Sequence, residues 1–542
     1  MASLTPYSGL LGRRLAAHLL RRSTFNITRE RITEFSNYNV DQALDALLVI
    51  PSKLMEEPID PLTNEQWITE VVPPNSSNGL LRKYVASWWI NEALLDTSLH
   101  HKMMYFLFTD FTVNMYSFNS LITFDYLSIL DHFALGDLQE FAYQSTISNA
   151  MLIYLNNNTN NKVNPNENYA REFLELFTIG KGDQIEEGNY TNYTEYDIQT
   201  AAKVLTGFKT KWDRSVIDPL TNIPTGYANY NQHDTTDKTF SSAFQNTVIT
   251  GAVDAEDMHR ELKDMIDMVF TQDETARYVC RKLYRYFVCR NITDEIETDI
   301  IIPLATTLKD NNYDLTFAVK ELLKSEHFYD KDDSINSDEI IGALIKSPLE
   351  STLQCLSYFK IDIPDPLTDS LNHYSLFYRR TVLDVILKFS AHDIFAPNTV
   401  AGFPAYFQEP DYDKNWFNAS TIIARYKLPE ILIQSKRILL SGNNIGGVKI
   451  DMPAFLSDLL NCSDPGNANT ILDELLADLF PEMVSNTRKL YYRDDVFLDN
   501  LSINTWAYEW QNYIDTGEDE NILIPLNNLF RSIIYSQEFQ CN

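Results

Sequence analysis

NENYAREFLELFTIG, at residues 166–180, has the pattern of a helix that is apolar around most of its circumference. Glu167, Arg171 and Glu175 are spaced four residues apart and therefore align on one helical face. The other faces hold aromatic and aliphatic side chains: Tyr169, Phe173, Leu174, Leu176 and Phe177. We expect a largely buried helix that carries one charged ladder.

The charged ladder has two interpretations. An arginine buried between two carboxylates must be paired, because an isolated charge in the interior is costly, and Glu172 or Asn168 is expected to join the network. In the favoured interpretation, the ion pairs are structural and fix the position of the helix. In the other, a carboxylate with a shifted pKa at the base of a cleft acts as an acid or a base. In that interpretation, Arg171, Glu172 and Glu175 are candidate catalytic residues.

Helical periodicity continues outside this segment. Leu11, Leu15 and Leu19 form one stripe of an amphipathic helix, and Asn39 is a typical N-cap for a second helix. Residues 80–155 are dense in aromatic and aliphatic side chains, which predicts a central core with a break between helices at Gly136-Asp137 and a helix running to Leu155. Further helices are expected after a capping box at residues 194–197, from about 255 to 323, from 340 to 356, and in several pieces over 421–539.

Residues 207–251 lack helical periodicity and are rich in turn residues. They predict a long ordered or functional loop, within which a short hairpin could form. The fold class is therefore expected to be all-α: a large multi-helix globular protein with long irregular loops.

Two units are expected within the chain: a helical core over residues 1–430, and a C-terminal helical region, 431–542, packed on it. Two patterns recur at nearly equal offsets: RKLY at residues 281–284 and 488–491, and an apolar pattern at 315–328 and 526–539. A decayed duplication of the unit at 260–330 would explain the recurrence. Chance similarity between amphipathic helices is the favoured explanation.

His233 and Asp234 lie in the 207–251 loop, from which an imidazole and a carboxylate could reach a site. They are further candidate catalytic residues. The favoured alternative is a local Asx turn with an exposed histidine. His18 is expected to make a hydrogen bond in the core, and His100-His101 to be a solvated pair at a helix end.

Composition excludes several classes of function. Asp and Glu number 75 against 44 Lys and Arg, and the resulting charge of -31 disfavours a nucleic-acid partner. A hydrophobic share of 44% is ample for a packed core. The 5 cysteines are scattered and form no C-x-x-C pair, so neither a zinc site nor a disulfide framework is expected. No metal-ligating residue is identified and no cofactor is expected, but this prediction does not cover calcium or magnesium. The motifs GxGxxG, GxxxxGK, GxSxG and HExxH are absent, which leaves nucleotide binding, serine hydrolysis and zincin chemistry without support.

No apolar run approaches the roughly 18 residues that a membrane helix needs, so membrane insertion is not expected. Residues 1–10 lack the pattern of a cleavable signal. We expect an acidic, soluble protein of the cytoplasm, with the periplasm or the cell surface as the alternative.

Residues 166–180 resemble the signature of the domain-of-unknown-function family 1800, and TyrThrGlu at 193–195 and LeuThrGly at 205–207 follow at the matching interval. Further agreements occur in order at residues 17–22, 151–155, 233–238, 275–284 and 345–350. The resemblance extends over about residues 11–425. It implies no established activity.

The chain departs from this family at two places. Where the family commonly has Phe-Trp-His-Asn-His-Phe, residues 106–111 are FLFTDF, without either histidine. The family's later Gly-Trp-Pro element appears here as Gly402-Phe403-Pro404. The resemblance therefore implies that any metal binding or proton transfer by those histidines is altered in this chain.

The features together favour a helical binding or assembly component with an unidentified protein partner, in which the charge network is chiefly structural. The first alternative is a hydrolase-like or metal-assisted enzyme whose site combines Arg171, Glu172 or Glu175 with His233 and Asp234. The second is a structural cell-surface protein.

Overall fold

The computed structural model describes residues 2–49, 57–68, 77–332, 340–432, 438–440, 443–445, 452–459 and 461–542. These residues form a mainly α-helical protein with a few short antiparallel strand pairs. The all-α prediction is confirmed.

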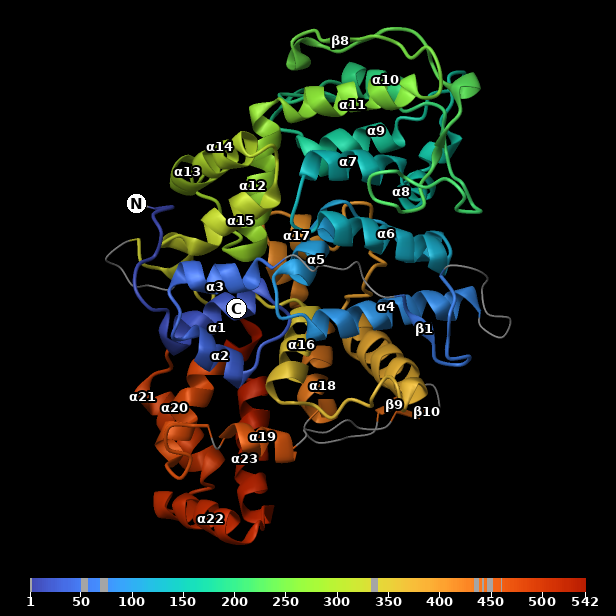
Figure 1. Cartoon of the computed structure of the whole chain (residues 1–542). Coiled ribbons are helices and arrows are strands. Elements are labelled where there is room, and N and C mark those ends of the chain that lie inside the picture. The colour runs from blue at the N-terminus through green and yellow to red at the C-terminus, as the bar shows by residue number, and fades with distance from the viewer. Residues whose placement is uncertain are drawn as a thin grey trace.

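The first helices form the middle of the molecule (Figure 1). They are α1 (Gly12–Ser23), α2 (Arg29–Phe35), α3 (Val40–Leu47), α4 (Asn78–Leu95), α5 (His100–Asp110) and α6 (Ser120–Phe133). Asn39 caps α3 by accepting from the Gln42 N–H, and the Gln42 side chain accepts from the Asn39 N–H in return, as the sequence predicted for this N-cap. His18 on α1 contacts the Phe328 carbonyl oxygen at 3.0 Å, which confirms its expected place in the core.

The next helices gather at one end (Figure 1). They are α7 (Leu138–Ile147), α8 (Asn149–Tyr154), α9 (Asn168–Glu172), which continues into a π-helix (Phe173–Thr178), α10 (Glu195–Val204) and α11 (Asp257–Phe270). Asp137 caps α7, so the predicted break between helices is confirmed. The predicted helix to Leu155 is split into α7 and α8, because Ser148 ends one helix and caps the next. Thr194 and Asp197 form the predicted capping box of α10.

A third group leads back toward the centre. It comprises α12 (Asp273–Phe287), α13 (Asp294–Ile296), a π-helix (Glu297–Ile301), α14 (Ile302–Asp310), α15 (Leu315–Lys324), α16 (Pro348–Tyr358), a long π-helix (Leu371–Leu387), α17 (Pro404–Phe407) and a 3-10 helix (Tyr412–Trp416). The last helices, at the far end, are α18 (Thr421–Leu432), α19 (Met452–Leu459), α20 (Ala468–Leu479), α21 (Asn486–Leu490), a π-helix (Tyr491–Phe497), α22 (Ile503–Thr516) and α23 (Glu520–Tyr535).

The strands are short. The pairs are β1 (Ile59–Asp60) with β2 (Glu65–Gln66), β3 (Gln184–Glu186) with β4 (Asn189–Tyr190), β5 (Phe208–Lys209) with β6 (Tyr227–Ala228), β7 (Lys238–Thr239) with β8 (Val248–Ile249), and β9 (Ile438–Leu440) with β10 (Asn443–Ile445). The 207–251 loop thus contains two such pairs, where the sequence suggested one hairpin.

The chain end returns to the middle of the molecule. Asn542 accepts from the Arg22 guanidinium and from the Gly342 N–H, and its own N–H donates to the Leu344 carbonyl. The C-terminal residues are thereby tied to the body of the protein. The division at residue 430 stays a prediction.

The proposed repeat has one local parallel. Ser325 after α15 accepts from the Phe328 N–H, and Ser536 after α23 accepts from the Phe539 N–H, each at the start of a 3-10 turn. Leu490 of the other matched pattern is 46% exposed, whereas its counterpart Leu283 is fully buried. A duplication stays a prediction.

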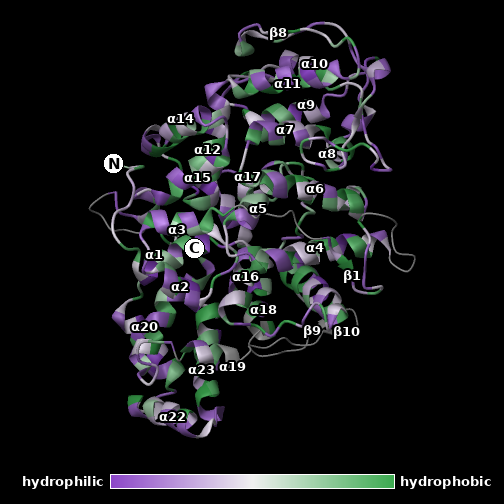
Figure 2. Cartoon of the chain, viewed as in Figure 1, coloured by the Kyte–Doolittle hydropathy of each residue, from purple (hydrophilic) through white to green (hydrophobic). Residues whose placement is uncertain are grey.

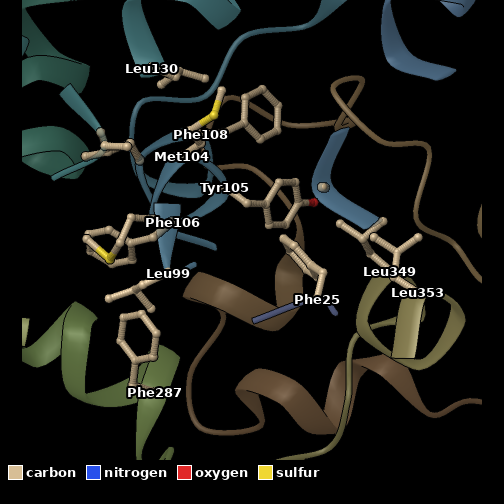
Figure 3. Packing of buried hydrophobic residues seen from close by; sticks show 14 of the residues in the cluster. Phe25, Leu99, Met104, Tyr105, Phe106, Phe108, Leu130, Phe287, Leu349 and Leu353 are labelled. Carbon is tan, nitrogen blue, oxygen red and sulfur yellow. The ribbon is translucent and has the colours of Figure 1, made fainter. Parts of the chain in front are cut away.

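One hydrophobic core extends through the described helices, from Leu11 to Phe539. Hydrophobic residues are distributed along helices throughout the molecule (Figure 2). α5 lies within this core, where its side chains pack near Phe25, Phe287 and Leu353 (Figure 3). The expected solvated pair at the start of α5 was wrong, since His100 and His101 are buried against Asp131 and Asp96. Among the described residues, no helix combines the length and the apolar character needed to cross a membrane.

Candidate functional site

Arg171 does not lie in a buried ladder. Its side chain is 36% exposed and pairs with Glu195 at 2.6 Å and with Glu167 at 3.2 Å. Glu175 instead pairs with Lys181 and accepts from the Tyr193 hydroxyl at 3.3 Å. The expected burial was wrong for Arg171. Within the described ranges no ion pair joins Arg171 to Glu175, and the helix has π geometry from Phe173 onward, where the α-helical spacing assumed for the ladder does not apply.

Glu172, which follows Arg171, has a pKa that is shifted into the neutral range. Burial, reinforced by the negative charge of Glu175, raises the pKa of Glu172 to about 7. Burial, with a smaller effect of the Glu172 charge, raises the pKa of Tyr154 to about 12, and the Tyr154 hydroxyl donates to the Thr399 carbonyl at 3.4 Å. The Glu172 carboxyl can therefore both release and accept a proton near neutral pH.

His233 is fully buried, in contrast to the exposed histidine of the Asx-turn interpretation. Its Nδ1 lies 2.8 Å from the Thr206 carbonyl oxygen, and its Nε2 lies 3.0 Å from Glu261 Oε2. Lys238 completes this group with an ion pair to Glu261 at 2.6 Å, and all three side chains are fully buried. The cluster fastens the 207–251 loop to α11.

Asp234 forms the Asx turn that was expected, accepting from the Thr236 N–H at 2.9 Å. Within the described ranges, no hydrogen bond or ion pair joins His233 or Asp234 to Arg171, Glu172 or Glu175. The two groups of residues in the predicted composite site, around Arg171 and around His233, therefore contact different side chains. A catalytic role for these residues stays a prediction.

A cavity borders the same π-helix at Leu176. About 90 Å³ of it is available to the centres of water-sized molecules, several times the space that one water needs. α5, α12, α17 and the start of α16 contribute to its walls together with Leu176 and the chain end. Its lining residues include Asp110, Lys282, Arg285, Glu350, Asp413, Tyr278, Tyr286, Tyr406, Tyr412 and Trp416.

Asp110 and Lys282 form an ion pair in the cavity wall. Lys282 also donates to the Leu176 carbonyl, which lies in the last turn of the π-helix and lacks a helical donor. The Asp110 side chain is only 2% exposed, and its Oδ2 has no hydrogen-bond partner among the described residues. Burial raises the pKa of the Asp110 carboxyl, and the Lys282 ammonium opposes that rise only in part.

Gly180 positions one aromatic wall of the cavity. It adopts a φ of +73°, and a Cβ at this position would lie 2.7 Å from the Tyr278 ring. Glycine therefore allows both the turn that ends the π-helix and the close approach of Tyr278. The Tyr278 ring in turn lies 4.2 Å from Lys282 Nζ.

Two other carboxylates of the wall are satisfied inside the protein. Glu350 pairs with the buried Lys102 and accepts from the Ser347 N–H at 2.6 Å. Burial disfavours the charged form of Glu350, but Lys102 outweighs that effect and lowers the pKa of Glu350. Asp413 pairs with Arg290 at 2.5 Å and accepts from the Ile345 N–H at 2.7 Å.

Arg285 has fewer partners. Its guanidinium lies 4.6 Å from the centre of the Tyr412 ring, and its closest carboxylate, Glu409, is 3.9 Å away. Its Nε has no hydrogen-bond partner in the part of the chain that the structure describes. Arg285 and Lys282 are three residues apart on α12 and both line the cavity.

Sequence reasoning did not select this site, although its signals were present. Asp110 occupies the place of the last histidine in the altered 106–111 stretch, and Lys282 and Glu350 belong to family-like segments. Those segments were recognised by their resemblance to the family alone, and no role was predicted for their charged side chains. Their convergence on one cavity depends on helix packing, which the sequence pattern does not reveal.

No group of three or more His, Cys, Asp or Glu side chains in the described ranges is arranged to hold a metal ion. Comparison with known proteins yields no matching curated protein and no matching solved structure. A family model described as a protein of unknown function, DUF1800, matches residues 18–540, which include all of the cavity-lining residues except Asn542. The chain therefore belongs to the DUF1800 family.

Proposed function

We propose that this protein is a binding component and that its ligand site is the cavity between α5, α12, α16 and α17. The observation that carries the proposal is one cavity lined both by aromatic rings and by the charged side chains of Asp110, Lys282 and Arg285. Ligand sites commonly combine an apolar surface with a few such convergent polar groups.

The family-like segments add support. Residues 106–111, 275–284 and 345–350 each contribute side chains to this one cavity, and Leu176 brings the signature helix to it. Because these family-like segments lie around one cavity, their arrangement supports a ligand site there.

Blocking the cavity tests the proposal. Ala401 lines it, so Ala401→Phe should fill it, whereas Ala243→Phe changes a partly buried alanine of the 207–251 loop. We would titrate both variants and the unchanged protein with a panel of sugars, sugar acids, sugar phosphates and cyclic carboxylic acids by calorimetry. At least one compound should bind the unchanged protein and the Ala243 variant but not the Ala401 variant. Absence of binding throughout the panel, or binding that survives Ala401→Phe, would contradict the proposal.

One observation favours an enzymatic alternative. Glu172 has a pKa of about 7 and lies one turn before Leu176, which lines the cavity. A carboxyl with that pKa is suited to general acid–base catalysis at neutral pH. A hydrolytic activity that Glu172→Gln abolishes without weakening ligand binding would favour this alternative.

We also propose a protein partner and no nucleic-acid partner. The charge of -31 supports the second part, because a surface of that sign repels a phosphate backbone. Residence in the cytoplasm is the favoured location, with the periplasm or cell surface as the alternative. Fractionation of the producing cells followed by immunodetection would decide between them.

A further inference from the structure

We infer that a groove formed by α7, the start of α11 and residues 216–228 is the docking site for a basic, amphipathic segment of a partner protein. The inference rests on the protein partner proposed above and names the chemistry of the segment that it would present. The groove is separate from the ligand cavity, because none of the residues that line the groove lines the cavity. Its size, its exposed apolar side chains and its charge support the inference.

The walls of the groove are held in place by contacts within the protein. α7 and α11 lie in the group of helices at one end of the molecule (Figure 1). Lys263 of α11 pairs with Glu140 of α7 at 3.2 Å, and both line the groove. The remaining wall, residues 216–228, is tied to α7 because the Gly226 N–H and the Thr225 hydroxyl both donate to the Ile147 carbonyl, at 2.9 and 3.1 Å. The groove is therefore formed before any partner binds.

The size of the groove favours a macromolecular segment over a small molecule. About 1130 Å³ of the groove is open to the centres of water-sized molecules, against 90 Å³ in the cavity. Pockets for small molecules usually measure roughly 300–1,000 Å³ and enclose most of their ligand. This groove exceeds that range and is bordered by exposed side chains, so a peptide segment fits it better than a compact ligand does.

Apolar side chains are exposed along this groove. Leu220 is 58% exposed and Val253 is 72% exposed. Four of the large apolar residues that the structure leaves exposed line the groove together: Ile217, Leu220, Tyr227 and Val253. Single exposed apolar residues are common on soluble proteins, but a group of them beside a groove is typical of an interaction surface. The partner segment should therefore present apolar side chains.

The lining residues also carry an excess of negative charge. The groove is lined by six carboxylates and two cations: Asp137, Glu140, Asp218, Asp254, Glu256 and Asp257, with Arg260 and Lys263. Four negative charges are therefore left without a balancing cation. Burial lowers the pKa of His259, so its imidazole does not supply one near neutral pH. Asp218 is only 7% exposed and accepts from Gln144 and Thr221, but it has no ion pair in the part of the chain that the structure describes.

Neighbouring charges outside the lining do not remove this excess. Asp264 adds a negative charge through its ion pair with Arg260 at 2.5 Å. Lys211, which lies 6.0 Å from the Tyr227 ring, is matched by Asp213 at 3.4 Å. Lys209, opposite Tyr227 in the β5–β6 pair, donates to two backbone carbonyls and offsets the charge of Asp264. The excess therefore remains at four when these neighbours are counted.

A segment with lysines or arginines on one side and apolar side chains on the other complements both properties of the groove. A second copy of this chain is disfavoured, because each copy has a net charge of -31. A metal ion or a small polyamine would balance the charge but leave the exposed apolar side chains uncovered. A basic, amphipathic protein segment is the occupant that satisfies both.

Four probes separate the two requirements, with binding measured by fluorescence anisotropy. Three are labelled peptides of about 15 residues, or about four helical turns, composed of lysine and leucine, of lysine and serine, or of glutamate and leucine. The fourth is spermine, added as a competitor. The lysine–leucine peptide should bind at least tenfold more tightly than each other probe. Equal or tighter binding of any of them would overturn the inference.

Charge variants test the place of binding. Glu256→Lys should weaken binding of the lysine–leucine peptide at least tenfold, because it reverses an exposed charge in the groove. Glu187→Lys is the matched control, since Glu187 is also exposed and its replacement changes the net charge of the protein by the same amount outside the groove. Equal weakening by both variants would show attraction to the overall charge alone and would contradict a site in the groove.

A second pair of variants tests the apolar contact. Leu220→Ser should weaken binding of the same peptide at least tenfold, whereas Leu62→Ser should leave it unchanged. The two leucines are matched: they are 58% and 50% exposed, and the N–H of each donates to the aspartate two residues earlier, Asp218 or Asp60. Circular dichroism would verify that each variant is folded. Unchanged binding in Leu220→Ser would contradict apolar docking.

Affinity capture from the producing cells separates this inference from the proposal of a protein partner. A protein that is retained by the unchanged chain and by Glu187→Lys, but not by Glu256→Lys or Leu220→Ser, would support both. Retention of one protein by all four would support a partner but overturn its docking in this groove. If no protein is retained and no peptide binds, both fail, while the ligand cavity is still tested by Ala401→Phe.

Discussion

Asp110 of α5 and Lys282 of α12, which are 172 residues apart in the sequence, form an ion pair at the wall of the cavity. The pair links the altered family stretch to the helix that carries Arg285. Lys282 also satisfies a carbonyl at the end of the signature helix. One lysine thus connects three family-like segments, which has consequences for stability as well as for binding.

Lys282→Met should lower the free energy of unfolding at pH 7 by on the order of 3 kcal/mol, because it leaves the Asp110 carboxylate buried without a counter-charge. Urea unfolding would measure the loss. Lys309→Met is the control: its ion pair with Asp273 is largely exposed, so that change should cost less than about 1 kcal/mol. Equal costs for the two variants would show that the Asp110 pair is not an interior interaction.

The loss caused by Lys282→Met should depend on pH. The pKa of Asp110 is raised in the folded protein, so folding takes up a proton, and the stability from this group is present below the unfolded pKa of about 3.9 and is lost as pH rises through the folded pKa. Removing Lys282 raises the folded pKa further. The variant should therefore be less impaired at pH 5 than at pH 7 in the same urea experiment, and a loss that grows on acidification would contradict this.

Glu172→Gln should flatten the pH dependence of stability between about 4.5 and 7. The folded pKa of Glu172 is raised to about 7, so its contribution is fully present below the ordinary value of 4.5 and is lost as pH rises through 7. Above pH 7 the variant should be the more stable protein, since a neutral amide replaces a half-buried carboxylate. Urea unfolding from pH 4.5 to 8 checks this, with Glu187→Gln as an exposed control. An unchanged profile in Glu172→Gln would refute the shifted pKa.

Glu261→Gln should weaken the packing of the 207–251 loop against α11. Glu261 is the shared partner of His233 and Lys238 in a fully buried group, so the change leaves a buried ammonium without its counter-charge and should cost about 3–5 kcal/mol. Hydrogen exchange should rise over residues 230–251 first. Asp234→Asn alters a partly exposed Asx turn and a longer, 4.0 Å ion pair with Lys238, so it should cost less than Glu261→Gln. A stable Glu261→Gln variant that loses ligand binding would instead favour a functional role for His233.

Arg171→Ala should cost less than about 1 kcal/mol, because its ion pairs with Glu167 and Glu195 are more than one-third exposed. Glu175→Gln should not rescue it, since Glu175 pairs with Lys181. A double-mutant cycle measured by urea unfolding would give a coupling energy near zero. A loss of several kcal/mol in Arg171→Ala would restore the buried-ladder interpretation.

Helices and their ends were predictable where the deciding interactions are local. The capping boxes at Asn39 and Thr194 and the break at Asp137 involve hydrogen bonds between groups two or three residues apart, so the sequence pattern contains both partners. The widening of the signature helix at Phe173 was not predictable, because α and π geometries differ by one residue in hydrogen-bond spacing and are not distinguished by apolar periodicity.

Patterns in the sequence were sufficient to predict the helical class, several caps and the DUF1800 resemblance, since each depends on neighbouring residues or on recognisable motifs. Contacts between distant segments leave Arg171 partly exposed, bury His233 against Glu261 and bring Asp110 to Lys282, and none of these was predictable from local patterns. The physical reason is that the burial and pairing of a charge depend on which distant helix covers it. A periodic pattern records which face of a helix is apolar, but not which other helix packs on that face.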